Sequence, residues 1–402
     1  MSGGVIEIAA AASAFRASLT LPETGSGPGL VVFRDVSDQD RDLREVSDLY
    51  AAEGYVVLCP ETFAIANEAE AVTAAVETLR SRSECTGKVG TLGFGLGGRL
   101  AYPAAAKAGV DCAVSYYGFD IEFALNFAPR IGCPLVLHFA EKDPQIPPPA
   151  VAQFKQAFYG RSEIAVHVYP GVAPGFDRKT QANYDRAAAG LAHSRTIALL
   201  RRVMGPHYDL EALWEKHTTY EFAVRDVAAT MRTMVAEPYV NHVPVMTGGV
   251  GQRDLARFYA QHFIPKLPAD TGLVPISRTV GADRVVDEML FCFTHDVEID
   301  WMLPRVPPTG RYVEVPLVAI VNFRGDKLYH EHIYWGQASV LVQIGLIDPA
   351  GLPVAGIETA KKLLDETRPS NTLMNRWTEG SGLVVAAVIP YPPSGRRRDE
   401  AR

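Results

Sequence analysis

The sequence predicts two tandem domains: a doubly wound, mostly parallel α/β sheet, followed by an α+β domain with a curved antiparallel sheet. The chain has 402 residues, about twice the length of a typical domain. Short apolar segments alternate with amphipathic helical ones in its first half, whereas helices precede long strands in its second half. We therefore expect domains at 1–204 and 216–365, a linker at 205–215 and a tail at 366–402.

Each strand of the first half is predicted from a short apolar segment that is bounded by turn residues. Leu30–Phe33, for example, is continuously apolar, as expected of a strand buried on both faces. The segment 40–53 places Leu43, Val46 and Leu49 on one helical face, and Gly54 ends it. Further strands are expected within 5–21 and at 55–59, 88–93, 112–117, 134–139 and 164–169, and further helices at 66–82, 101–108, 149–158 and 184–204.

The second half changes to helices followed by long strands. Its helices are expected at 217–235 and 254–263. The long segment 284–301, expected as one long strand or as a bent hairpin arm, alternates apolar and polar residues toward its end, as a half-buried strand does. The other strands are expected at 273–281, 312–323 and 328–335, with one more in the tail at 383–389, before a terminal run of arginines.

Composition excludes several classes of protein. The formal net charge of −7 makes nucleic acid an unexpected partner. No segment reaches the roughly 18 consecutive apolar residues of a membrane span, and the first residues lack the features of a signal peptide. The five cysteines form no CxxC pair, so neither a disulfide framework nor a structural zinc site is expected. A cytoplasmic protein without a cofactor is the resulting expectation.

A glycine-rich turn, Gly93-Phe-Gly-Leu-Gly-Gly98, joins a predicted strand to a predicted helix. A nucleophile elbow of an α/β-hydrolase occupies such a turn, since glycines permit its sharp backbone path. A phosphate-binding loop is the alternative. The first strand carries no such loop, however, and a single glycine-rich turn is weak evidence for nucleotide binding.

Residues 1–204 resemble the dienelactone hydrolase (carboxymethylenebutenolidase) family of α/β-hydrolases. The segments that carry the resemblance lie at 51–60, 88–100, 115–118, 133–143 and 169–178. The family uses a Cys–Asp–His triad, and the resemblance maps its three members onto Gly95, Asp143 and Pro174. Glycine supplies no nucleophile and proline no base, so the resemblance implies a catalytically degenerate triad.

Residues 214–360 resemble the SnoaL-like polyketide cyclase branch of the nuclear-transport-factor-2-like fold. The residues that carry it lie at 239–242, 293–296, 301–304, 308–311 and 326–343. This resemblance implies a cone whose apolar interior binds a small carbonyl compound. There a His/Asp set performs acid–base chemistry without metal or nucleotide. Cones of this type often dimerise through the sheet, so the resemblance also makes a homodimer one of the expected assemblies.

Histidines are the candidate catalytic residues of the second half. His295 alternates onto the same apolar face as Trp301, and His242 lies in the family's Asn-His element. Either one can also be a hydrogen-bonded core histidine. Zinc bound by His242, His295 and His332 is disfavoured, because no local metal-binding pattern accompanies them.

The last strand supplies the rest of the predicted pocket. Its alternation puts His330, His332, Tyr334 and Gly336 on one face, which we take as the pocket face. Gly336 stands where the family generally has an aspartate that acts as base. A histidine (His242, His295 or His332) therefore replaces that base, or the pocket binds without catalysing.

Three functions follow from these observations. The first is a cofactor-independent enzyme that acts on a small apolar carbonyl or polyketide-like compound by cyclisation, isomerisation, elimination or hydration. In this case the first domain is a catalytically degenerate scaffold. The second is a dienelactone or ester hydrolase with an altered mechanism, in which Asp143 activates water. The third is a non-catalytic protein that binds a small molecule.

Overall fold

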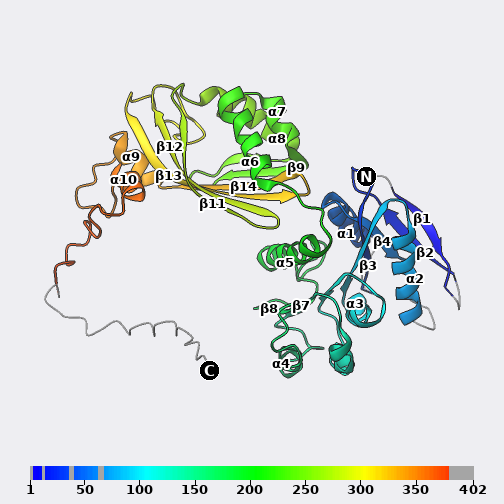
Figure 1. Cartoon of the computed structure of the whole chain (residues 1–402). Coiled ribbons are helices and arrows are strands. Elements are labelled where there is room, and N and C mark those ends of the chain that lie inside the picture. Colours follow the sequence, from blue (N-terminus) through cyan, green and yellow to red (C-terminus); the bar gives the residue numbers. More distant parts are fainter. Residues whose placement is uncertain (1–2, 11–13, 36–39, 62–67, 380–402) are drawn as a thin grey trace, which may run out of the picture.

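The computed structural model describes residues 3–10, 14–35, 40–61 and 68–379. Two sheets, each with its own helices, follow one another along the chain (Figure 1). No helix among the described residues is long and apolar enough to cross a membrane. The expected strand at 383–389 and the terminal arginines lie outside the described residues.

The first sheet has eight strands in the order β1-β2-β4-β3-β5-β6-β7-β8. The six strands from β4 to β8 in this order are parallel, while β1 and β2 add an antiparallel edge. The prediction of a mostly parallel sheet is thus confirmed. The strands are β1 (Gly3–Ile8), β2 (Phe15–Thr20), β3 (Gly27–Phe33), β4 (Val56–Pro60), β5 (Cys85–Phe94), β6 (Cys112–Tyr116), β7 (Leu135–Ala140) and β8 (Ile164–Tyr169).

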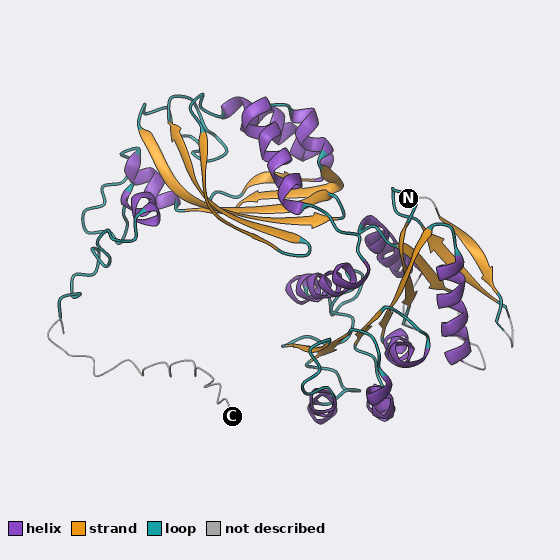
Figure 2. Cartoon of the chain, in the orientation of Figure 1, coloured by secondary structure: helices purple, strands orange, loops and turns teal. Residues whose placement is uncertain are grey.

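Helices cover both faces of this sheet, which makes the fold doubly wound (Figure 2). One apolar core lies between the sheet and α2, α3 and α4, and a second lies between the sheet and α1 and α5. The helices are α1 (Asp40–Ala52), α2 (Glu68–Ser81), α3 (Leu96–Lys107), α4 (Pro148–Ala157) and α5 (Arg186–Met204), with a 3-10 segment at Ile121–Arg130.

The second sheet has six strands in the order β10-β9-β14-β13-β12-β11. All its pairs are antiparallel except β14 with β9. The long strands follow the prediction, whereas the β9–β10 hairpin fills a segment for which none was predicted. The strands are β9 (Met234–His242), β10 (Thr247–Val250), β11 (Gly272–Val280), β12 (Arg284–Thr294), β13 (Tyr312–Arg324) and β14 (Lys327–Trp335).

Helices α6, α7 and α8 pack on one face of the second sheet and enclose its apolar core (Figure 1). Two turns of π-helix extend α6 and α8, and two short helices, α9 and α10, follow β14. The bounds are α6 (Leu210–Thr218), η2 (Thr219–Val224), α7 (Val227–Arg232), α8 (Gly251–Phe258), η3 (Tyr259–Phe263), η4 (Ile264–Lys266), α9 (Gln337–Gln343) and α10 (Glu358–Leu364).

Three predicted boundaries differ from the structure. The helix expected at 217–235 is broken at Arg225, whose positive φ of 58° ends η2 before Asp226 caps α7. The strand expected at 284–301 ends at Thr294, because the chain then turns away from the sheet. Leu210 and Trp214 are part of the second core, so the linker expected at 205–215 is largely helix α6.

A buried carboxylate joins the two halves. Glu53, at 0% exposure, accepts hydrogen bonds from Arg201 Nη2 at 2.7 Å and from the backbone N–H of Gly325 at 3.1 Å. His193 Nε2 lies 3.0 Å from the same carboxylate. Since Gly325 belongs to the β13–β14 turn, this carboxylate holds the second sheet against α1 and α5.

Candidate functional site

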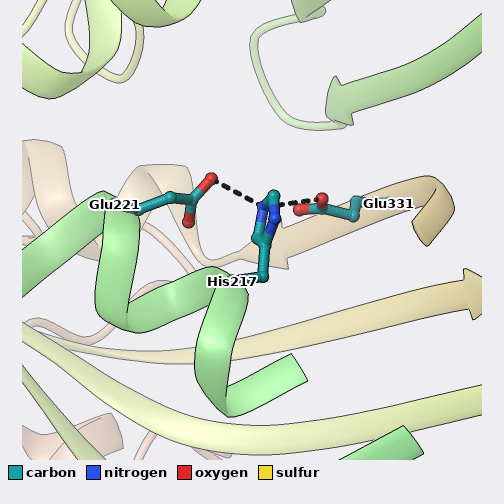
Figure 3. A group of neighbouring side chains, drawn as sticks. All are labelled: His217, Glu221 and Glu331. Atoms are coloured by element: carbon teal, nitrogen blue, oxygen red, sulfur yellow. Dashed lines mark hydrogen bonds and ion pairs between the residues drawn. The ribbon is translucent and has the colours of Figure 1, made fainter. Parts of the chain in front are cut away.

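A buried cluster of one histidine and two glutamates lies inside the second domain (Figure 3). His217 Nε2 is 3.0 Å from Glu221 Oε1 and 3.2 Å from Glu331 Oε1. His217 and Glu221 come from α6 and η2, and Glu331 comes from β14. All three side chains are at most 5% exposed. We call these three residues the His–Glu–Glu cluster.

Local geometry brings the three side chains together. His217 and Glu221 are four residues apart, the spacing that places two side chains on one helical face. Strand alternation points Glu331 to the same interior as Ile333 and Trp335, which are both buried. Segments of π-helix such as η2 are rare and are found frequently at functional sites.

The hydrogen bonds show which form of His217 is present. Thr233 donates its hydroxyl proton to the carbonyl of Thr230 at 2.6 Å, so it can only accept at the 2.5 Å contact with His217 Nδ1. The other ring nitrogen, Nε2, faces both carboxylates and donates its proton to Glu221 Oε1 at 3.0 Å. Both ring nitrogens therefore carry protons, and His217 is an imidazolium.

The pKa values agree with this arrangement. Burial lowers the pKa of His217, but the charges and hydrogen bonds of Glu221 and Glu331 outweigh it and raise this pKa to about 10. Burial raises the pKa of Glu331, although His217 opposes the shift. Glu331 is thus a carboxyl group that can change its protonation state closer to neutral pH than an exposed glutamate.

A small, largely apolar cavity of about 40 Å³ adjoins the cluster. His242 is 4% exposed, and burial lowers its pKa to about 4, so its imidazole is neutral at pH 7. Among the described residues, its Nδ1 has no hydrogen-bond partner. Other residues lining the cavity are Glu221, Glu331, Phe222, Tyr259, Phe263, Phe291, Trp301 and Ile333.

The His–Glu–Glu cluster also has the composition of a metal-ligand set. One ligand atom from each of its residues lies within 4.8 Å of the other two. Imidazole and carboxylate together suit several divalent cations. A cation there would have to displace the Nε2 proton of His217, which the raised pKa makes costly at neutral pH.

The structure divides the predicted pocket residues into two groups. His242 and Trp301 line the cavity. His330, His332 and Tyr334 do not; they lie on the opposite face of β14, and Tyr334 is 41% exposed. The predicted pocket face was wrong, because its assignment extended the strand alternation to Gly336, which lies past the strand end and caps α9.

His295 occupies a different position from the predicted one. It lies in the loop after β12, fully buried, with Nδ1 3.1 Å from the hydroxyl of Thr309. It does not line the cavity described above. The alternation that placed it beside Trp301 does not apply, since the strand ends at Thr294. Its contacts are those of a core histidine.

In the first domain, Gly95 forms the turn between β5 and α3 with φ 53° and ψ −115°. This is the strand-to-helix turn of a nucleophile elbow, and its central residue has no side chain. A Cβ built on Gly95 would lie 2.5 Å from Cγ of Asp35, so that carboxyl group fills the space a nucleophile would need.

The other two predicted triad positions are Asp143 and Pro174. Asp143 is 6% exposed, and its Oδ1 accepts the backbone N–H of Gln145 at 2.8 Å. Pro174 has no titratable group; its carbonyl accepts a bond from Asn183 at 3.0 Å. These positions therefore hold one acid, but neither the nucleophile nor the base of a covalent hydrolase.

Sequence reasoning missed the whole His–Glu–Glu cluster. Two signals were available. His217 and Glu221 have helical i, i+4 spacing, and Glu331 alternates with Ile333 and Trp335, the bulkiest apolar residues of its strand. An acidic residue on an apolar strand face marks a buried carboxylate more directly than histidines on the polar face do.

Comparisons with known proteins point to one family. The model described as the dienelactone hydrolase family matches residues 64–204. A protein of Azospirillum brasilense assigned as a carboxymethylenebutenolidase is 31% identical over 209 residues, which make up 45% of this chain and 90% of the relative. Carboxymethylenebutenolidase 1 of Cupriavidus pinatubonensis is 27% identical over 233 residues, 51% of this chain and 99% of the relative.

Among solved structures, a dienelactone hydrolase-like promiscuous phosphotriesterase from metagenomic libraries is similar to this chain, with 18% sequence identity and a TM-score of 0.46. The match covers 51% of this chain and 99% of the phosphotriesterase chain. The identity to the Azospirillum protein, over nine-tenths of that protein, is enough to assign the family. Through its first half, the chain belongs to the dienelactone hydrolase family.

Proposed function

We propose that this protein is a cofactor-independent acid–base enzyme whose reaction takes place in the cavity of the second domain. The observation that carries the proposal is the position of Glu331, a buried carboxyl group held beside His217 at the wall of an apolar cavity. We further propose that this domain is a SnoaL-like cone of the nuclear-transport-factor-2-like fold. Its six-stranded sheet and the helices that enclose the core support this assignment.

Each polar group has a role in this proposal. Glu331 takes a proton from carbon next to a substrate carbonyl and returns it elsewhere, since its raised pKa brings it nearer the working pH. The imidazolium of His217 stabilises the carboxylate form of Glu331 between transfers. Neutral His242 offers a hydrogen bond to the carbonyl oxygen, where negative charge develops. The apolar walls strengthen each of these interactions.

The size of the cavity restricts the substrate. At about 40 Å³ it has room for only a few water-sized groups. This favours a small apolar carbonyl compound within the predicted class, and isomerisation or proton exchange over cyclisation of a long chain. The first domain, which lacks a nucleophile at Gly95, serves in this proposal as a degenerate scaffold.

A hydrolase is the second candidate, and family membership favours it. In that alternative Asp143 activates water for attack on an ester or lactone, without a covalent intermediate. The buried position of Asp143 at the end of the sheet is compatible with a base, but its Oδ1 is already engaged by Gln145.

Deuterium exchange tests the main proposal without knowledge of the natural substrate. Acetylacetone and 2-cyclopentenone are incubated with the full chain in D2O, and NMR follows exchange at carbon. We expect enzyme-dependent exchange that falls at least ~100-fold in E331Q, a typical loss for a general base. E288Q is the matched control, because Glu288 lies on the same sheet, bonded to Ser277 outside the cavity.

Two results would contradict the proposal. One is exchange of both probes that E331Q leaves unchanged. The other is hydrolysis of p-nitrophenyl acetate that D143N abolishes and E331Q preserves, which would favour the hydrolase.

A further inference from the structure

A second cavity, of about 190 Å³, lies between the two domains. Its walls come from α1, α5 and the strand ends of the first domain, and from β12, β13 and β14 of the second. The sheet face that lines it is the one opposite to the His–Glu–Glu cluster, and His330 belongs to it. This interdomain cavity is therefore separate from the site of the proposed function.

Cationic side chains dominate this cavity. Arg284 and Arg324 line it from the second domain, and Arg186 and Lys179 from the first. In the part of the chain that the structure describes, none of the four makes a salt bridge. Arg186 and Arg324 instead stack on tyrosine rings, Arg324 with Cζ 4.0 Å from the ring centre of Tyr329.

Two carboxylates also line the cavity, and each accepts a hydrogen bond from a neutral hydroxyl group. Asp177 accepts the hydroxyl of Tyr117 at 2.7 Å and lies 3.6 Å from Arg178. Asp283 accepts the hydroxyl of Ser194 at 2.6 Å. The four cations therefore outnumber the two acids, and among the described residues neither acid forms a salt bridge with any of the four.

Unpartnered polar atoms of the second domain gather at the same place. They are Nε of Arg284, Nε of Arg324, Oδ1 of Asn322 and Nδ1 of His330, and all four residues line the cavity. Asn322 is only 7% exposed. Buried polar atoms are almost always hydrogen-bonded, so four exceptions around one cavity show that the protein leaves hydrogen-bonding capacity unused in this part of the domain interface.

The electrostatic surroundings of His330 agree with this excess of positive charge. Burial and then the neighbouring His332, Arg186, Arg284 and Arg324 lower the pKa of His330 to about 3. Burial disfavours a charge of either sign, whereas the positive charges of the three arginines disfavour a further cation and favour an anion.

The remaining wall is aromatic. Tyr50, Phe94 and Tyr116 line the cavity from the first domain, and Tyr329 lines it from the second. Aromatic walls suit a flat apolar body, and guanidinium groups suit the two oxygens of a carboxylate. The volume is below the roughly 300–1,000 Å³ of pockets for drug-sized ligands, so the ligand is small.

We propose that the interdomain cavity binds a small aromatic carboxylate, with its carboxylate on Arg284 and Arg324 and its ring between the tyrosines and Phe94. Phe94 directly precedes Gly95, so the ligand lies at the strand edge where the first domain has lost its nucleophile position. The first domain thus keeps a binding role that needs the second domain to complete it.

Calorimetry with the full chain tests this proposal, with benzoate as probe and benzamide as its neutral counterpart. We expect benzoate to bind and benzamide to bind at least tenfold more weakly. R284Q and R324Q should each weaken benzoate binding at least tenfold, because neither arginine has another ionic partner. R253Q is the matched control, since the side chain of Arg253 is 94% exposed on α8.

A second measurement does not depend on the variants' folding. In the unaltered chain, bound benzoate should raise the pKa of His330, read by NMR, by at least one unit. Absence of benzoate binding, equal binding by R284Q and R324Q, or an unmoved pKa of His330 would each overturn the proposal. Inorganic phosphate that binds as tightly as benzoate would overturn the aromatic carboxylate as the ligand. None of these readouts requires turnover in the other cavity.

Discussion

Glu331 Oε1 lies 3.2 Å from Nε2 of His217, and neither side chain is more than 3% exposed. Burial of a charged pair is favourable only when the charges and hydrogen bonds compensate for lost hydration. Here Glu221 accepts the Nε2 proton of the imidazolium and the hydroxyl of Thr233 accepts its Nδ1 proton, while Glu331 adds a second negative charge beside Nε2. The cluster is therefore both a stabilising element and a set of groups with shifted pKa values.

The raised pKa of His217 predicts a loss of stability at alkaline pH. Its folded pKa is about 10, against about 6.5 in an unfolded chain. The folded state thus binds the extra proton, and the stabilisation is complete below pH ~6.5 and is lost as pH rises toward 10. We expect the free energy of unfolding to fall by up to about 1.4 kcal/mol per pH unit in this window. Urea unfolding between pH 6 and 10 measures it.

The double variant E221Q/E331Q provides the control, since it removes the charges that raise this pKa. Burial then dominates, and the slope between pH 6.5 and 10 should disappear. An unchanged slope in the double variant would show that other groups cause it.

The opposite pH dependence is expected from His242. Burial lowers the pKa of His242 to about 4. The stabilisation of the folded state that comes from neutral His242 is therefore complete above pH ~6.5 and is lost as pH falls through 4. The full effect is about 3 kcal/mol, from 1.36 kcal/mol per pKa unit. In H242F, the free energy of unfolding should decrease less between pH 6.5 and 4 than in the unaltered chain. H207A serves as the control, because His207 is exposed. An equal decrease between pH 6.5 and 4 in H242F and in the unaltered chain would refute the assignment.

Replacement of Gly95 by cysteine should cost stability without restoring hydrolysis. A side chain at φ 53° is strained, and its Cβ would meet the carboxyl group of Asp35. We expect G95C to lower the free energy of unfolding by about 1–3 kcal/mol. G95C/D35A should recover part of this loss by removing the clash. p-Nitrophenyl acetate hydrolysis should stay at background in G95C, because Pro174 supplies no base; a gain of activity would contradict this account.

Glu53 should couple the unfolding of the two domains. E53Q removes the charge from the buried partner of Arg201 and weakens the bond to Gly325. Loss of one member of a buried ion pair costs about 3–5 kcal/mol. We expect E53Q to separate thermal unfolding into two calorimetric transitions. E84Q is the control, because the Glu84–Arg82 pair is near the surface; a single transition at the original temperature in E53Q would disprove the coupling.

The local pattern of apolar and polar residues was sufficient to predict most of the strands and helices. Continuous apolar strands between amphipathic helices predicted the parallel sheet, and the turn at Gly95 has the predicted elbow geometry. The predictions failed where backbone direction changes without a proline or a glycine run. Thr294 ends β12 and Arg225 ends η2 in this way, and neither residue type marks a boundary.

The sequence by itself determined the class of the first domain, and it has no nucleophilic or basic side chain at Gly95 or Pro174. It also indicated that His242 and Trp301 lie in an apolar interior, where both are buried. Only the tertiary structure decided which face of β14 is the interior. Alternation assigns residues to two faces but does not say which face the helices cover. Because α6 packs over the face that carries Glu331, the buried acid–base groups are His217, Glu221 and Glu331, while His330 faces the first domain.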